Sequence, residues 1–212
     1  MKLKLFLVFS LFISSFSINA QTDKAFYSLN LDDDIDIIST SGFTYRHINV
    51  EVSNFGTEDI NVHFPPGGFF VNLDSNEQNL VVLFYDVLEV KAGQKESSLI
   101  GTACANPNRK PPKKGRTTWI YDYDEKLGKL IMFYHENRAI VEIATGKEHH
   151  ETILKRQNFL QMCVWIYYDA EKEQILKFAT TYLFNGNQES AEFFVETFYP
   201  IAVTFIDLYK RM

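Results

Sequence analysis

The chain contains only two cysteines, Cys104 and Cys163, among 212 residues. Two are too few for a fold that depends on a set of disulfides, although they allow one bond. The sequence also lacks a Gly-x-Ser-x-Gly nucleophile elbow, a glycine-rich phosphate loop and a His-Glu-x-x-His zinc motif. His149 and His150 are adjacent, so on a helix they would face different sides and make no zinc pair. The sequence therefore indicates no metal site, no cofactor and no enzyme class.

The apolar run near the start of the sequence is too short to span a membrane. This run, residues 5–13, is shorter than the roughly 20 residues that a spanning helix requires. Lys2 and Lys4 precede this run, and Ala20 offers a small residue before a cleavage site. The pattern predicts a signal peptide over residues 1–20, export to a periplasm or out of the cell, and no transmembrane segment in the mature chain.

Basic residues are in the minority. The chain has 21 basic and 27 acidic residues, and Lys2 and Lys4 belong to the expected signal. The mature chain therefore keeps 19 basic residues and a net charge of −8, which argues against nucleic acid as a partner. Because 46% of the residues are hydrophobic and 15% are aromatic, the chain can bury a real core.

Residues 21–42 form an acidic lead-in. Asp32, Asp34 and Asp36 alternate as in a calcium loop, but Ile37 occupies the place of the required glycine. We therefore interpret this stretch as a solvated approach to the first strand.

Residues 43–105 carry strand patterns separated by turn signals. Two alternating segments, 48–52 and 60–64, flank a turn at 54–59 and predict a hairpin. Further strands are expected at 69–73, 79–85, 87–90 and 97–103. The order resembles a small immunoglobulin-like module, which implies an antiparallel β-sandwich and no particular function.

Residues 118–212 have mainly helical patterns after a short β-like piece at 118–121. We expect helices from Asp124 to about Asn137, over 148–169, over 173–184 and over 191–211, the last one kinked or split by Pro200. The predicted fold is thus α+β, with the N-terminal sandwich followed by a C-terminal bundle of three or four helices.

A basic, proline-rich connector over residues 106–117 joins the two parts. As a functional element it would bind an anionic ligand, and as a structural element it would be a stiff, solvated linker. Its candidate anion-binding residues are Arg109, Lys110, Lys113, Lys114 and Arg116.

The two cysteines allow three interpretations. The segment 160–165, Leu-Gln-Met-Cys-Val-Trp, is similar to a motif of exported bacterial thioester domains. That resemblance implies a bond between the Cys104 thiol and the acyl group of Gln161, which an amine or hydroxyl on a target surface would attack. An oxidising compartment would instead favour a Cys104–Cys163 disulfide. In the third interpretation both thiols are unpaired and Cys163 is a small buried hydrophobe.

The leading functional hypothesis is an exported, non-enzymatic binding module for a protein, a glycan or an anionic surface. Covalent adhesion through the Cys104–Gln161 thioester is the first alternative. A hydrolase whose residues converge only in space is the second.

Overall fold

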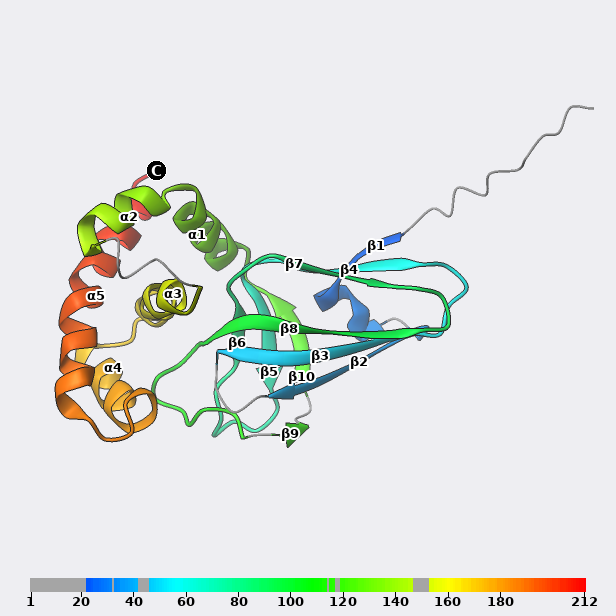
Figure 1. The fold of residues 1–212 in the computed structure, drawn as a ribbon, viewed down its shortest axis with the longest axis horizontal. Helices are drawn as coiled ribbons and strands as arrows, with labels where there is room; N and C mark the ends of the chain where they lie inside the picture. Colours follow the sequence, from blue (N-terminus) through cyan, green and yellow to red (C-terminus); the bar gives the residue numbers. More distant parts are fainter. Residues whose placement is uncertain (1–21, 32, 42–45, 114, 117–118, 147–152) are drawn as a thin grey trace, which may run out of the picture.

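The computed structural model describes residues 22–31, 33–41, 46–113, 115–116, 119–146 and 153–212. The expected signal peptide lies outside these residues. The described strands form two sheets, and helices follow them (Figure 1). The predicted α+β class, with strands first and helices second, is therefore confirmed.

The smaller sheet has three strands in the order β1-β4-β7. β1 runs parallel to β4, whereas β7 pairs with β4 in the antiparallel direction. A 3₁₀ helix, η1 (Phe26–Leu31), follows β1, and its Phe26 is fully buried against Phe64 and Phe70. The strand bounds are β1 (Thr22–Ala25), β4 (Ile60–Phe64) and β7 (Asp86–Val90).

The larger sheet has the order β10-β5-β6-β8-β3-β2-β9, and its paired neighbours are antiparallel. β8 is central: its first part pairs with β3 and its last residues pair with β6. The bounds are β2 (Ile35–Ser41), β3 (His47–Asn54), β5 (Gly68–Asn72), β6 (Leu80–Val82), β8 (Lys95–Cys104), β9 (Gly115–Arg116) and β10 (Trp119–Tyr123).

The helices occupy one end of the molecule, and α3 is the helix that packs on β8 (Figure 1). A π-helical turn, η3 (Ala179–Leu183), continues α4. Pro200 lies inside α5, which remains one helix. The bounds are α1 (Glu125–Glu136), α2 (Arg138–Thr145), α3 (Ile153–Tyr167), α4 (Lys172–Phe178) and α5 (Gln188–Lys210).

One continuous apolar core joins the sheets and the helices. Trp165 on α3 is fully buried and packs edge-on against Phe178, at 5.2 Å between ring centroids. Tyr134 on α1 stacks on Phe159 of α3 at 5.4 Å. Because apolar burial is the main favourable term in folding, this shared core makes the two parts depend on each other for stability.

Several expectations from the sequence are wrong in detail. β3 and β4 do not form the predicted hairpin, because β3 pairs with β2 and β8 whereas β4 pairs with β1 and β7. The acidic lead-in contains β1 and β2, and β10 belongs to the sheet although it lies in the predicted helical region. Five α-helices are described instead of three or four, because α2 begins directly after α1.

Candidate functional site

The connector after β8 is held against the sheet by Gln78, which is fully buried. The Gln78 side chain donates to the carbonyl of Arg109 at 2.9 Å and accepts from the amide of Asn106 at 3.0 Å. Its main-chain amide donates to the carbonyl of Lys110 at 2.9 Å. The connector is therefore a loop held to the sheet through main-chain groups of residues 106–110, while the side chains of Asn108 and Lys110 are exposed.

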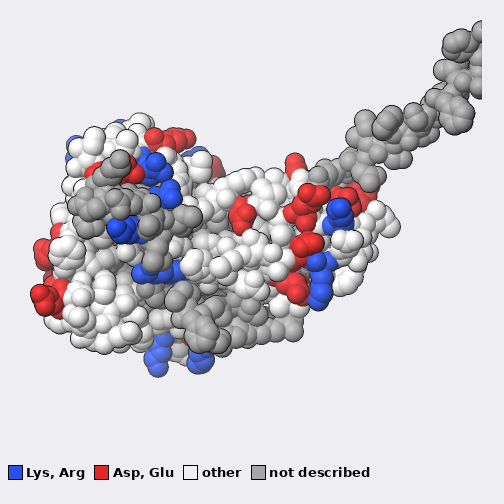
Figure 2. All heavy atoms as spheres, in the orientation of Figure 1, with Lys and Arg blue, Asp and Glu red and all other residues white. Residues whose placement is uncertain are grey.

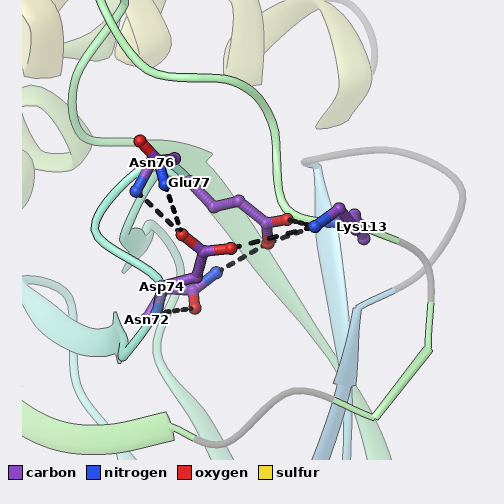
Figure 3. Close-up of polar contacts among 5 residues, drawn as sticks. All are labelled: Asn72, Asp74, Asn76, Glu77 and Lys113. Atoms are coloured by element: carbon purple, nitrogen blue, oxygen red, sulfur yellow. Dashed lines mark hydrogen bonds and ion pairs between the residues drawn. The ribbon is translucent and has the colours of Figure 1, made fainter.

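Glu77, the residue before Gln78, also binds the connector, and its carboxylate is nearly buried (Figure 3). We call the contacts of Glu77 and Gln78 with the connector the clamp. One oxygen accepts from the side-chain amide of Asn72 and from the main-chain amide of Lys113, at 3.0 and 3.1 Å. The other oxygen lies 3.0 Å from the Lys113 ammonium, which is also 3.8 Å from Asp74. Burial raises the pKa of Glu77, but these hydrogen bonds and the Lys113 charge outweigh it, so the pKa lies below its ordinary value.

The clamp places the connector beside α4, where a cleft of about 480 Å³ opens. Arg109 and Lys110 line the connector side, and Lys177 lines the helix side. Glu173 is the one carboxylate among the lining residues, so the described wall carries a net positive charge. Neutral groups complete the wall and offer hydrogen bonds or a ring face: Asn108, Gln174, Thr181 and Tyr182.

Acidic and basic side chains are mixed at both ends of the face in Figure 2. Basic side chains stand out at the lower edge, where Figure 1 draws the connector. A chain with an excess of acids thus presents a local basic region, and low-dielectric walls would focus its potential on an anion.

The predicted anion-binding residues separate into groups. Arg109 and Lys110 line the cleft, whereas Lys113 is an ion-pair partner of Glu77 and Asp74. Lys114 lies outside the described residues. Arg116 belongs to β9, which pairs with β2 at the other edge of the sheet from β10.

Sequence reasoning missed Lys177, Thr181 and Tyr182, which the structure brings to the connector. The spacing of four between Lys177 and Thr181 puts them on one helical face, but no local signal indicates which segment that face meets. The connector lies beside this face because Glu77 and Gln78 bind it. Both residues come more than 25 positions before the connector residues that they contact.

Gln161 and Cys104 are in contact through the main chain of Cys104. The Cys104 amide donates to Gln161 Oε1 at 2.7 Å, and Gln161 Nε2 donates to the Cys104 carbonyl at 2.7 Å. One turn earlier on α3, Gln157 donates to the carbonyl of Arg46 at 3.0 Å. Two glutamines on one face of α3 therefore bind main-chain groups at the ends of β8 and β3.

The predicted Cys104–Cys163 disulfide is absent from the structure. Both cysteines are free thiols and do not lie near each other. Cys104 is fully buried and Cys163 is 1% exposed. Burial raises the pKa of both thiols well above the ordinary value, so the reactive thiolate is disfavoured in the folded chain.

A chain of hydrogen bonds joins Asp23, His63 and Tyr85 on the smaller sheet. His63 Nε2 lies 3.0 Å from Asp23 Oδ1, and His63 Nδ1 bonds the Tyr85 hydroxyl. The hydrogen bond from His63, with another from Asn61, lowers the pKa of Asp23. Tyr85 and Asp23 thus occupy both ring nitrogens of His63. We therefore interpret the array as a tie between β1, β4 and the segment before β7.

Within the described ranges, no three His, Cys, Asp or Glu side chains are arranged to hold a metal ion. None of the described helices has the length and apolar character that crossing a membrane requires. Comparisons with protein-family models, curated proteins and solved structures give no match. The chemistry of the cleft is thus the basis for assigning a function.

Proposed function

We propose that this protein is an exported, non-enzymatic binding module that takes an acidic glycan in the cleft between the connector and α4. The observation that carries the proposal is the meeting of Arg109, Lys110 and Lys177 in one cleft of an otherwise acidic chain. These cations come from two distant segments, and the clamp by Gln78 fixes one of them.

The lining suits an acidic sugar better than a bare anion. Arginine and lysine pair with carboxylate, sulfate or phosphate groups, and the planar guanidinium can do so with two hydrogen bonds. Asn108, Gln174 and Thr181 can bond sugar hydroxyls, and the Tyr182 ring offers an apolar face. The volume of the cleft lies within the range of small-ligand sites.

Calorimetric titration with a heparin-derived hexasaccharide tests this proposal. We expect Lys110→Glu and Lys177→Glu each to weaken binding about tenfold or more, because each reverses a charge beside the ligand. Lys91→Glu, at an exposed turn before β8, is the matched control and should leave the affinity unchanged. Wild-type affinity in both cleft variants would contradict the proposal.

Export is the second part of the proposal, and the pattern of residues 1–20 supports it. Expression of the full chain in a bacterial host, followed by fractionation and N-terminal sequencing, tests this part. We expect a product outside the cytoplasm that begins near Gln21. An uncleaved chain in the cytoplasm would contradict export and leave the cleft proposal to its own test.

Covalent adhesion is a second candidate because Gln161 lies against Cys104. The thiol would add to the side-chain amide carbon, the carbon–nitrogen bond would break, and ammonia would leave. Intact mass with and without methylamine tests it, with Cys104→Ala as the control. Because an N-terminal Gln21 can also cyclise with loss of ammonia, only a loss that methylamine reverses and Cys104→Ala prevents would support the thioester.

A sandwich of the two sheets is the finer proposal about the fold. It is supported by the continuous core, to which Val50 of the larger sheet and Val62 of the smaller sheet both contribute fully buried side chains. An experimental structure in which these two side chains do not face each other across one core would contradict it.

A further inference from the structure

A second cavity, of about 600 Å³, lies in the helical part between α3, α5 and the segment that joins η3 to α5. Its volume falls in the range of small-molecule sites, which are mostly apolar with a few placed polar groups. Four of its eight lining residues are phenylalanines: Phe184, Phe193, Phe194 and Phe198. The cavity is separate from the basic cleft, and it shares no lining residue with it.

The spacing of residues along α5 explains the apolar wall. Ser190, Phe194 and Phe198 recur every four residues, so they lie on one face of the helix. Phe194 is only 4% exposed and contacts both Phe184 and Phe198, at 5.7 and 5.4 Å between ring centroids. Phe193 is 65% exposed although it belongs to the same lining. The cavity thus has a packed aromatic floor and an aromatic rim open to solvent.

Polar groups gather on the other side of this cavity. Lys155 and Asn158 of α3 are three residues apart and therefore share a face. The first turn of α5 adds Glu189 and Ser190, and this helix end carries the positive pole of a 23-residue helix. Glu189 is the one carboxylate in the described lining. It lies in the first turn of α5, so the positive end of the helix dipole offsets part of the negative charge of Glu189. Lys155 is the one cation among the lining residues that the structure describes, so it is the group that would attract an anionic ligand.

We propose that this cavity binds a medium-chain alkyl carboxylate, with the chain on the phenylalanine wall and the carboxylate at Lys155 and Asn158. The aromatic wall supplies the area that an alkyl chain needs to leave water, and affinity should rise about fourfold for each added methylene. The carboxylate would pair with the Lys155 ammonium and accept a second hydrogen bond from the uncharged Asn158 amide. A protein partner is less suitable, because stable interfaces bury a far larger total surface than the lining of one cavity offers.

Calorimetric titration of the purified chain with decanoate tests this inference. Saturable one-to-one binding is expected, with about tenfold weaker binding to Lys155→Met and substantial recovery in Lys155→Arg. Phe193→Ala should weaken binding several-fold and leave the fold intact, since that ring is largely exposed. The matched controls are Lys210→Met at the far end of α5 and Phe55→Ala on the β3–β4 turn, and both should bind decanoate as the wild type does.

Two other ligands with the same chain length test whether the carboxylate head group is required. We expect decanol and decyltrimethylammonium to bind at least tenfold more weakly than decanoate. Equal binding of decanol would overturn the role of Lys155, and tighter binding of the ammonium compound would identify Glu189 as the anchor instead. No saturable binding of decanoate to the folded wild type would overturn the site altogether. Heparin hexasaccharide should bind unchanged in Lys155→Met, so the two sites can fail independently.

Discussion

The side chain of Gln161 pairs with the main chain of Cys104 through two hydrogen bonds of 2.7 Å, one in each direction. The glutamine thus acts toward β8 as a neighbouring strand would, and it joins the helical part to the end of the central strand. Both residues are buried, so neither water nor another side chain can easily replace the pair.

Replacement of Gln161 by alanine should therefore cost about 2 to 4 kcal/mol of unfolding free energy, because two buried main-chain groups lose their partners. Urea unfolding followed by circular dichroism measures this loss. Gln188→Ala is the control: its side chain bonds exposed groups, and the change should stay within about 0.5 kcal/mol. A cost below about 1 kcal/mol for Gln161→Ala would show that the pair does not hold the two parts together.

The Glu77 carboxylate should make stability depend on pH. Its pKa is lowered in the folded chain, so the ionised form stabilises the fold above the unfolded pKa of about 4.5. That contribution is lost as the pH falls through the lower, folded pKa. We expect Glu77→Gln to cost about 1 to 3 kcal/mol at pH 7 and less at pH 3.

Urea midpoints at pH 7, 5 and 3 measure this difference for the wild type, Glu77→Gln and the control Glu89→Gln. Glu89 is exposed on β7, and its replacement should change little. A gap between wild type and Glu77→Gln that widens toward pH 3 would contradict the assigned direction of the pKa shift.

The state of the two thiols has a direct chemical readout. With both cysteines free and buried, Ellman's reagent should label neither in the native protein and both after unfolding without reductant. No label after unfolding would indicate a disulfide. One labelled thiol that becomes two after hydroxylamine would indicate the thioester.

A close approach between α1 and the loop before β5 depends on glycine. A Cβ added at Gly128 would lie 2.6 Å from the carbonyl oxygen of Pro66, and backbone cannot yield as a flexible side chain can. Gly128→Ala should therefore cost about 2 kcal/mol or more. Gly93→Ala is the comparison, since Gly93 has a φ of +68° but no atom within 4 Å of the added Cβ. It should cost only about 1 kcal/mol, and an equal loss in both variants would refute the steric account.

Some elements could be predicted because their signals are local. Asp124 caps α1 by accepting from the Leu127 amide, as its position before an apolar run indicated. The helix expected over 173–184 is followed by Asn185 and Gly186, which both have positive φ, as is typical of residues that end a helix. β8 and β7 likewise followed from their own patterns.

The missed features depend on partners that are remote in sequence. The turn after β3 correctly indicates a change of direction, but the partners of β3 and β4 lie in different sheets. Asn137 looked like the end of a helix, and it is also the cap of α2, which starts at once. The hydrogen bonds that hold the connector could not be predicted, because its composition carries no trace of Glu77 and Gln78. Of the three cations that line the cleft, Arg109 and Lys110 were predicted from the sequence, and Lys177 was found only in the structure.

The most direct test of the cleft is to map the ligand onto the chain. Titration of the ¹⁵N-labelled protein with heparin hexasaccharide should shift amide signals over residues 107–110 and 173–182, and Lys177→Glu should strongly reduce those shifts at the same ligand concentration. Saturable shifts confined to other residues, with these two segments unchanged, would contradict the assignment of the cleft as the binding site.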